Sequence, residues 1–541
     1  MFRANEAHNQ RSMFESTEWM NPRVRNKLEN SWAPIFYEHV FCKINEEPFS
    51  VLYGTTGNPN FPVNIILSLE YIKHVKNQSD SDLLDSFWFD YLVNYAVGIR
   101  TLGELNLAER TLYYFRERIY NYCLKNPEAE DILFGQFLGL LKEFAAKANI
   151  SLGEQRTDTT LFMSGIKKAG RISLAYDVLV RAVKAIPKAL RTDVLNKSLE
   201  PGFKTDVLYH TKAADGDGKL TMLLALIRDA VAILKPLQGL TESEEYRIAK
   251  RFLEEQSIID ADGAIAAKPK KEITSSSLQS AFDEDATYRK KGNVGQSGYS
   301  LELSETCSRE NPFQLITDYS VAPNNINDAD ILSSRLPAIK KNTGCTDMYV
   351  DGAFHSADVH DTAESNGIKI HLTNMTGTKP GKYLPVSSFE IDGETNVIIK
   401  CPGGQAPMNA GVSKGQTVAH FSHEDCANCP LIGRCQGKKQ VKSRVVRITL
   451  KSIKASCERE AINAAKVENT SKRAGIEGTN SALKRTGQDK LDVRGIVKST
   501  IVSGFKATAQ NIRRFIKYKR GGYERKSIPI PQCGILAPIP G

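Results

Sequence analysis

The chain has 541 residues, of which 41% are hydrophobic and 25% charged, the balance of a soluble globular protein with more than one domain. This composition excludes a collagen-like, a coiled-coil and a largely disordered chain. The most apolar helical stretch, residues 220–234, is interrupted by Arg228 and Asp229, and residues 1–14 have no apolar core of signal-peptide length. We therefore expect the protein to stay in the cytoplasm, where it is made.

The net charge of +10 is concentrated near the C-terminal end. Between Arg434 and Lys526 the sequence holds 25 Lys and Arg against 7 Asp and Glu, a net charge of +18, which leaves −8 for the rest. A basic segment attached to a neutral-to-acidic body favours a polyanionic partner, of which nucleic acid is the commonest. The alternative is a basic helix face that contacts only water.

The first 150 residues are expected to be helical after a flexible N-terminus at residues 1–30. Apolar side chains recur at helical spacing after Pro62, after a cap at Ser79 or Asp80, and after a capping-box pattern of Asn106 and Glu109. Residues 31–150 therefore predict a helical domain. A bundle that contacts DNA and one without that role look alike in sequence, so both interpretations stay open.

A mixed core of strands and helices is expected next. The expected strands lie at residues 155–162, 299–303, 313–321, 348–352 and 368–372. The second and third form a hairpin candidate, and a helix at residues 328–339 follows them. This order predicts an α/β core at residues 151–165 and 283–379, interrupted by a helical insertion and linker at residues 166–282.

Three segments complete the predicted organisation. Residues 380–450, rich in Gly, Pro, Val and Thr, are expected to form a second insertion of short strands and loops. Residues 451–526 are expected to be a basic helical part of the core. Residues 527–541 hold four prolines and are expected to form a loose tail.

Three acidic residues stand at the ends of expected elements. Asp158 lies in the first core strand, Asp351 follows a later strand directly before a glycine, and Glu477 begins a basic helix. Convergent carboxylates suit Mg²⁺ or Mn²⁺, and two such ions can activate an attacking oxygen and stabilise a leaving oxygen in phosphodiester chemistry. Each acid alone has an ordinary alternative as a turn or surface residue. At helical spacing, Arg473 and Lys484 share the face of Glu477.

The order and local context of these residues resemble the DDE transposases of bacterial insertion sequences. The central motifs are Gln155–Asp158, Tyr349–Phe354, and Arg473 with Glu477 and Lys484. Further agreeing stretches are Phe115–Arg118, Asp285–Lys291, Gly298–Tyr299, Leu303–Cys307, Leu315–Asp318 and Asn327–Asp328. The resemblance spans roughly residues 30–520, and it is to the group with an InsH-like N-terminal domain and a cysteine-bearing insertion.

This resemblance implies an RNase H-like catalytic core with a mixed sheet. It implies that Asp158, Asp351 and Glu477 are catalytic and bind two Mg²⁺ or Mn²⁺ ions. The implied partners are DNA, as terminal inverted repeats and target, and a second copy of the chain in a homodimer. The protein would then be associated with the nucleoid.

The resemblance also assigns DNA contacts to the basic helical segment. Arg473 and Lys484 match the cations of the family's tyrosine–arginine–glutamate–lysine signature, whereas the tyrosine position is Thr470 here. Lys472, Arg485 and Arg494 are further candidates for DNA binding, because they stand in the same basic stretch.

Four of the ten cysteines are grouped. Cys401, Cys426, Cys429 and Cys435 can bind a structural Zn²⁺ tetrahedrally, and the close pair Cys426 and Cys429 is the usual half-site. The alternative is four unligated thiols in a loop-rich insertion. His420 and His423 could replace a cysteine as ligands. The six other cysteines are scattered singly and are expected to be reduced thiols.

The predicted function is that of a DNA transposase, which cuts the ends of its insertion sequence and transfers the 3′-hydroxyl into target DNA. Three alternatives remain at this stage. One is an RNase H-like nuclease that cuts without joining. Another is a catalytically inactive or domesticated transposase-derived protein that only binds DNA, and the third is a zinc-dependent DNA-binding regulator.

Overall fold

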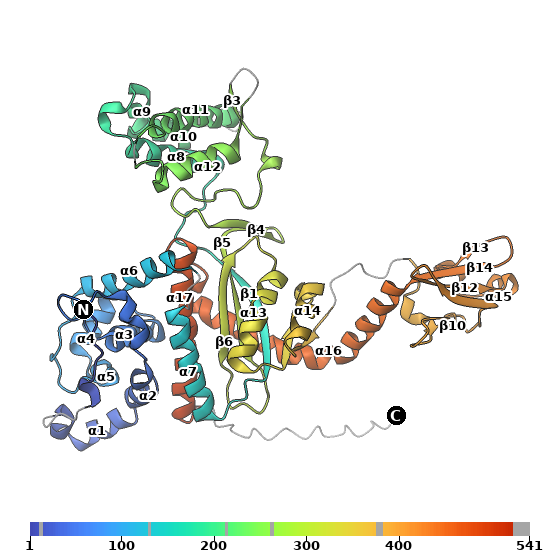
Figure 1. Ribbon diagram of the computed structural model, residues 1–541, viewed down its shortest axis with the longest axis horizontal. Coiled ribbons are helices and arrows are strands. Elements are labelled where there is room, and N and C mark those ends of the chain that lie inside the picture. The colour runs from blue at the N-terminus through green and yellow to red at the C-terminus, as the bar shows by residue number, and fades with distance from the viewer. Residues whose placement is uncertain are drawn as a thin grey trace, which may run out of the picture. The chain divides into compact units, whose positions relative to one another are not determined.

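The computed structural model describes residues 1–9, 15–127, 131–210, 215–237, 239–259, 264–374 and 382–522 (Figure 1). The chain divides into two compact units. The first comprises residues 1–152, 159–326 and 479–541, and the second comprises residues 153–158 and 327–478. The tail predicted at residues 527–541 lies outside the described residues. No helix of the described residues is long and apolar enough to cross a membrane.

The N-terminal part of the first unit is helical, as predicted. Its helices are α1 (Pro22–Glu29), α2 (Trp32–His39), α3 (Val63–Lys76), α4 (Asp80–Phe89), α5 (Tyr91–Ala96), α6 (Glu109–Lys125) and α7 (Ile132–Ala148). Ser79 caps α4 in a capping box with Asp82. The prediction of a cap at Asn106 was wrong, because Ala108 precedes α6 and makes no side-chain cap. Within the segment predicted to be flexible, residues 1–30, residues 22–29 form α1, which Asn21 caps.

Helix α17 (Ile496–Lys519) packs against α3, α7 and the core strand β6 (Ile316–Pro323) (Figure 1). Phe515 of α17 stacks on Phe144 of α7, with ring centroids 4.4 Å apart. Both rings are fully or almost fully buried. Burial of one such ring contributes about 1.5–3 kcal/mol, so this stacked pair is a strong anchor between the C-terminal helix and the N-terminal helices.

The insertion after the first core strand has a hydrophobic core of its own. It contains α8 (Arg171–Ala185), α9 (Asp193–Lys197), α10 (Pro201–Tyr209), α11 (Gly216–Leu234), α12 (Glu244–Gln256), β2 (Ser257–Ile259) and β3 (Ile265–Ala267). Leu179, Leu224 and Phe252 are fully buried in this core. The single long helical block that was predicted is divided, because Pro187 and Pro201 cannot continue a helix. Strand β2 follows α12 directly, and β3, which lies in the stretch predicted to be a linker, pairs with it in antiparallel orientation.

The core sheet is mixed, as predicted. Its strands are β1 (Glu154–Phe162), β4 (Thr287–Lys291), β5 (Val294–Thr306), β6, β7 (Asp347–Val350) and β8 (Lys369–Leu372). The strand order is β4-β5-β1-β7-β8, and β6 pairs with β5. Strands β1, β7 and β8 are parallel, whereas β4, β5 and β6 are antiparallel. Strand β4 was not predicted; it turns into β5 through Gly292, which has a φ of +61° that favours glycine.

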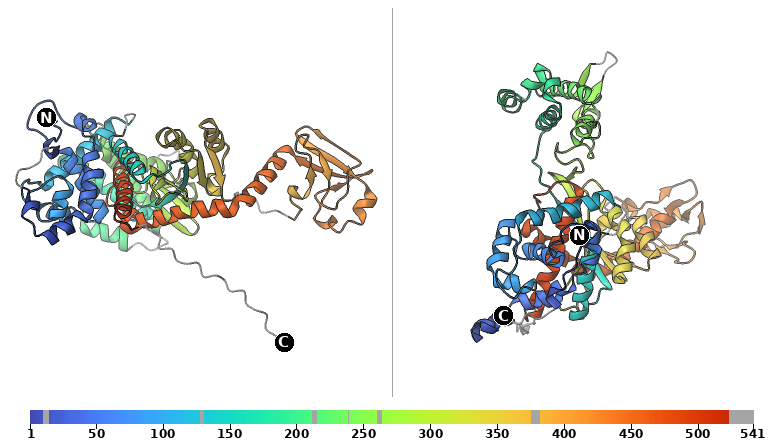
Figure 2. Two further views of the ribbon diagram at one scale, coloured as in Figure 1. Left: turned by 90° about the horizontal axis from the view of Figure 1, so that it is seen from below. Right: turned by 60° about the vertical axis from the view of Figure 1, so that its left-hand side comes forward.

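The second unit places helices beside the parallel strands. These helices are α13 (Asp328–Thr343), α14 (Ala357–Ser365) and α16 (Leu450–Leu483), with the short 3-10 helix η8 (Gly352–Phe354) after β7. Leu332, Met348 and Val350 are fully buried in one core. Helix α16 has 34 residues and is therefore about 50 Å long (Figure 2).

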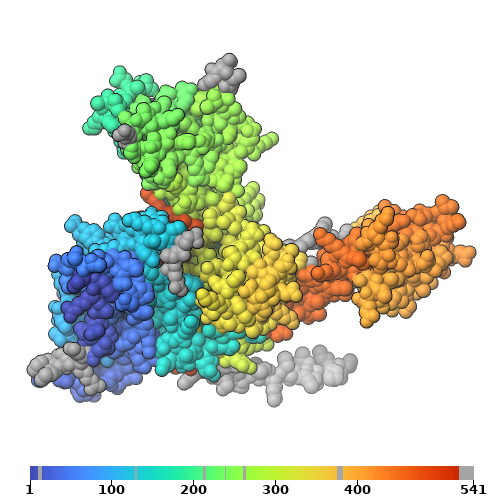
Figure 3. Space-filling model, in the orientation of Figure 1, coloured from blue at the N-terminus to red at the C-terminus, as the bar shows by residue number. Residues whose placement is uncertain are grey.

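Residues 382–449 form short strands and loops, as predicted. Their elements are β9 (Glu390–Ile391), β10 (Ile398–Lys400), β11 (Asn409–Ser413), β12 (Gln416–Phe421), α15 (His423–Ala427), β13 (Lys438–Lys439) and β14 (Arg444–Thr449). The sheet order is β11-β12-β14-β13. Phe389, Phe421 and Val446 lie in a small core beneath it. Figure 3 shows these residues, coloured orange, as one continuous block.

Candidate functional site

Two of the predicted carboxylates lie beside each other on the neighbouring parallel strands β1 and β7. Strands β1 and β7 pair with Arg156 opposite Tyr349. Two residues further along both strands, this register brings Asp158 and Asp351 to the same level and the same face. Asp351 follows the end of β7, and its carboxylate accepts a hydrogen bond of 2.8 Å from the backbone N–H of Ala353. The parallel pairing thus explains why two residues 193 positions apart in sequence come together.

The third carboxylate reaches the same place through an arginine on α16. The Arg473 guanidinium donates to Asp158 at 3.0 Å, to Glu477 at 3.2 Å and to Asp351 at 3.5 Å. Arg473 and Glu477 are four residues apart, so they share one helix face. The structure therefore brings the three predicted acids around a single guanidinium.

These four side chains differ in their exposure to solvent. The exposed fraction is 16% for Arg473 and 17% for Asp158, and it rises to 33% for Asp351 and 66% for Glu477. A half-exposed ion pair contributes little, whereas the pair of Arg473 with Asp158 is shielded and is the stronger one. The cluster therefore has a shielded inner pair, Arg473 with Asp158, and an exposed outer acid, Glu477.

Helix α16 is fastened to the sheet by the residue next to this arginine. Lys472 donates to Glu154 at 2.7 Å and to the Tyr349 hydroxyl at 2.9 Å. Burial lowers the pKa of Lys472, but the hydrogen bonds to Glu154 and Tyr349 have the larger combined effect, so the pKa is raised. Only 10% of the Lys472 side chain is exposed. The structure thus places this predicted DNA-binding residue in a contact between α16 and strands β1 and β7.

Two further contacts of α16 had no signal in the sequence. Asn469 donates 2.9 Å to the backbone oxygen of Leu372 at the end of β8. Arg156 of β1 donates 2.6 Å to the backbone oxygen of Lys472. Gly475 makes room for this arginine, because a Cβ at that position would lie 2.2 Å from the Arg156 guanidinium. These contacts set the position of the helix that carries Arg473.

The end of α16 differs from the prediction. Glu477 was expected to begin a basic helix that continues past Lys484, but it lies near the C-terminal end of α16, which stops at Leu483. Residues 484–488 form a wider helical turn in which Gly487 has a φ of +82°. A residue with this backbone conformation ends a regular helix, so no regular helix continues past Gly487.

The remaining predicted DNA-binding residues are exposed. Lys484, Arg485 and Arg494 all lie on the surface, as does Thr470. Arg494 donates 2.9 Å to the backbone oxygen of Gly165, and its guanidinium lies 5.0 Å from the centre of the Phe282 ring. Lys484 and Arg485 therefore have cationic ends that are accessible to an anion.

The four grouped cysteines surround one cavity of about 30 Å³. Cys401, Cys426, Cys429 and Cys435 all line it, and the Cys429 N–H donates to the Cys426 carbonyl in a tight turn. Burial raises the pKa of the Cys426 thiol, against the effect of Arg444, and the three neighbouring thiols raise it further. Thiolates are the ligand type that structural Zn²⁺ prefers, but no three of these sulfur atoms lie within 4.8 Å of one another in the described structure.

The two histidines considered as substitute ligands have other partners. His420 Nδ1 lies 3.0 Å from the Ser443 hydroxyl. His423 Nε2 lies 2.9 Å from the backbone oxygen of Gln440. Neither histidine lines the cavity between the cysteines.

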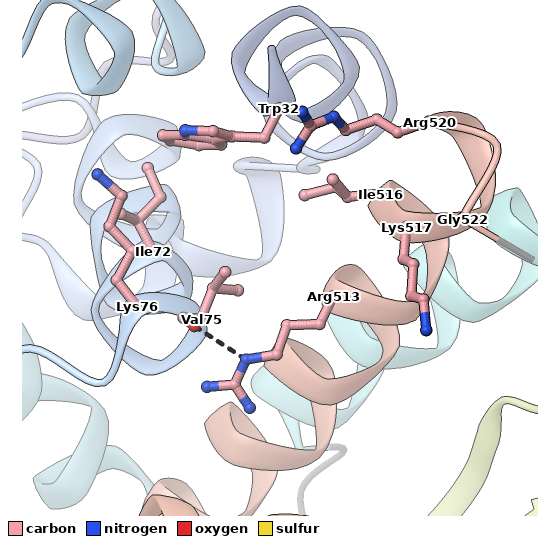
Figure 4. A pocket seen from close by; sticks show the side chains of 9 residues that line it. All are labelled: Trp32, Ile72, Val75, Lys76, Arg513, Ile516, Lys517, Arg520 and Gly522. Carbon is pink, nitrogen blue, oxygen red and sulfur yellow. Dashed lines mark hydrogen bonds between the residues drawn. The ribbon is translucent and has the colours of Figure 1, made fainter.

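A separate cavity of about 450 Å³ opens between α2, α3 and α17 in the first unit (Figure 4). Its lining residues are Trp32, Ile72, Val75, Lys76, Arg513, Ile516, Lys517, Arg520 and Gly522. The Arg513 side chain donates 2.8 Å to the backbone oxygen of Val75, and Lys76 pairs with Asp90 at 3.0 Å. Four cations line this cavity, and it contains none of the predicted site residues.

The comparisons with known proteins bear on the C-terminal part of the chain. Residues 400–516 match the family model of a transposase DDE domain. The matched segment contains Arg473, Glu477 and all four grouped cysteines. The match makes this segment similar to the DDE domains of transposases; it does not extend to Asp158 and Asp351. No curated protein and no solved structure matches the chain.

Proposed function

We propose that the chain is a DNA transposase that cuts the ends of its insertion sequence and joins the freed 3′-hydroxyl to target DNA. The observation that carries this proposal is the convergence of Asp158, Asp351 and Glu477 on the Arg473 guanidinium. The family match of residues 400–516 supports the same reaction class. The proposal extends to the group with an InsH-like N-terminal domain and an RNase H-like core.

The donor set of this site fits Mg²⁺ or Mn²⁺. Both are hard ions that prefer oxygen ligands, and Asp158, Asp351 and Glu477 offer carboxylate oxygens that already surround one positive group. Two bound ions would supply activation of an attacking oxygen and stabilisation of a leaving oxygen. The three acids would hold them, and Arg473 would release these carboxylates.

Arg473 then has a defined role before metal enters. Three carboxylates in one place repel each other, and a cation among them lowers that repulsion. The Ala353 N–H fixes Asp351, and the contacts of Lys472 with Glu154 and Tyr349 fix the helix that carries Arg473. The chain thus keeps the acids close together and orients them toward one point.

DNA is the proposed partner, both as terminal inverted repeats and as target. The exposed cations Lys484, Arg485 and Arg494 are the proposed contacts to backbone phosphates, which predicts that binding weakens steeply as the salt concentration rises. A homodimer is proposed as the active form, since the reaction joins two DNA ends. A structural Zn²⁺ at Cys401, Cys426, Cys429 and Cys435 is proposed to stabilise residues 382–449.

The test uses the full chain and the DNA that flanks its own gene, which should end in inverted repeats. We expect strand cuts at the repeat ends with Mg²⁺ or Mn²⁺, no cuts with a chelator, and joined products on a supercoiled target. Asp351→Asn should lower cutting by at least 10–100-fold while DNA binding stays unchanged, because a ligand contributes at least as much as the 10–100-fold typical of an outer-shell partner. Asp361→Asn, an exposed acid on α14, is the matched control.

Each alternative has its own outcome in this experiment. Cuts without joined products would replace the proposal by a nuclease. Tight binding without cuts by the unchanged chain would replace it by a DNA-binding protein without catalytic activity. Normal cutting by Asp351→Asn would remove this residue from the catalytic set.

A further inference from the structure

Two histidines and a glutamate meet in the second unit, away from the three carboxylates around Arg473. His355 follows η8, His360 lies on α14, and Glu458 lies on α16. Glu458 Oε1 lies 3.0 Å from His355 Nε2 and 3.8 Å from His360 Nε2. One ligand atom from each residue lies within 4.8 Å of the two others, the only such group of three metal-binding side chains among the described residues.

The hydrogen bonding of this cluster is incomplete. His360 Nε2 is shielded from solvent and makes no hydrogen bond. It faces the same carboxylate oxygen that His355 already contacts. A shielded nitrogen without a hydrogen-bond partner is unfavourable, and a cation bound between the three side chains would give it a partner.

The spacing of the donors suits a transition-metal ion. Nitrogen and oxygen ligands lie about 2.0–2.2 Å from Zn²⁺, which sets neighbouring ligands of a tetrahedral ion about 3.4 Å apart. The two separations from Glu458, 3.0 and 3.8 Å, stand on either side of that value. Two imidazoles with one carboxylate form a donor set typical of Zn²⁺, Mn²⁺ or Fe²⁺, whereas Mg²⁺ prefers oxygen ligands alone.

We propose that His355, His360 and Glu458 bind a divalent transition-metal ion, with Zn²⁺ as the best fit, and that this ion joins α14 to α16. The site is distinct from the carboxylates around Arg473, since Glu458 precedes Glu477 by 19 residues on one helix, about 28 Å along its axis. His355 follows Asp351 by four residues. The ion therefore links the segment after Asp351 to the helix that carries Glu477.

The test measures metal bound to the full chain and does not depend on DNA cleavage. The metal-site proposal can therefore fail while the proposed function stands, and the proposed function can fail while the metal site stands. Elemental analysis after Zn²⁺ loading should find one ion fewer per chain in His360→Ala than in the unchanged chain. Removal of a ligand should weaken Zn²⁺ binding here by at least the 10–100-fold that an outer-shell partner contributes. His210→Ala, an exposed histidine of the helical insertion, should lose no ion.

Cobalt separates this site from the four cysteines. Co²⁺ bound to thiolates gives an intense near-ultraviolet charge-transfer band, whereas Co²⁺ bound to imidazole and carboxylate gives only weak visible bands. His360→Ala and Glu458→Gln should lose the weak visible bands of this site and keep the thiolate band. An unchanged Zn²⁺ count and an unchanged cobalt spectrum in both variants would overturn the proposal, and the retained thiolate band shows that the variants are folded around the cysteines.

Discussion

Replacement of Arg473 by glutamine would remove the one cation that three carboxylates share. Two of these carboxylates contact the same guanidinium nitrogen, Asp158 at 3.0 Å and Asp351 at 3.5 Å. Their oxygens are therefore at most about 6.5 Å apart, a distance at which two unit charges repel by about 0.6 kcal/mol in water and about 2.6 kcal/mol at an effective dielectric constant of 20. The outer acid, Glu477, is 66% exposed and adds little to this repulsion.

We expect Arg473→Gln to lower the free energy of unfolding of the metal-free chain by about 1–3 kcal/mol near pH 7.5. Mg²⁺ should restore this loss, because the ion supplies the missing positive charge among the acids. The rise in melting temperature on addition of Mg²⁺ should therefore be larger for the variant than for the unchanged chain. Thermal unfolding with EDTA and with increasing Mg²⁺ measures both quantities.

The control variant is Arg459→Gln, an exposed arginine on the same helix, which should change neither the stability nor the response to Mg²⁺. The reasoning would be refuted if Arg473→Gln were as stable as the unchanged chain in EDTA. It would also be refuted if Mg²⁺ stabilised both proteins equally, since the guanidinium would then not stand in for the metal charge.

Two further changes test the electrostatics and the cysteine cluster. Burial, with the cations Arg513 and Lys73, lowers the pKa of Lys506 to about 8, so the unfolded chain binds more protons between pH 8 and about 10.4 and the free energy of unfolding should rise with pH there. At pH 7, the free energy of unfolding of Lys506→Met should be about 1–3 kcal/mol higher than that of the unchanged chain, and this difference should disappear by pH 10. Denaturant titrations at both pH values measure it. A difference in stability that does not depend on pH would contradict the low pKa of Lys506. Cys426→Ser should weaken the cobalt–thiolate band and make residues 382–449 more sensitive to protease. Cys457→Ser, which changes an exposed cysteine of α16, should do neither. A thiolate band of unchanged intensity in Cys426→Ser would exclude Cys426 as a ligand.

The core strands were predictable because their signals are local. Apolar runs between polar turns predicted β1, β5 with β6, β7 and β8, and the helix α13 is capped by Asn327 where the chain leaves β6. Strand β4 was missed because its sequence, residues 287–291, is mostly charged and polar. Such an edge strand is held by backbone pairing with β5, which a pattern of side chains does not reveal.

The site was predictable only in part, since it depends on contacts across long stretches of sequence. Asp158, Asp351 and Glu477 were predicted as a group, and they do meet at Arg473. The prediction placed Glu477 at the start of a helix, whereas it lies near the end of α16. The basic sequence around Glu477 carries no signal for a helix end; the end depends on Gly487, which adopts a positive φ in the structure. The contact of Lys472 with the sheet depends on the tertiary packing of α16, so its charge suggested a surface residue instead.

The bond between Arg473 and Asp158 closes a loop of 315 residues. Closure of such a loop costs about 2 kcal/mol more conformational entropy than closure of a loop of about 30 residues. The core of the helical insertion is formed by residues much closer together in the sequence. The insertion can therefore fold while the rest of the chain is still being synthesised. The acid cluster can form only after α16 has been made, and a nascent chain that ends before this helix therefore has no assembled site with which to act on nearby DNA.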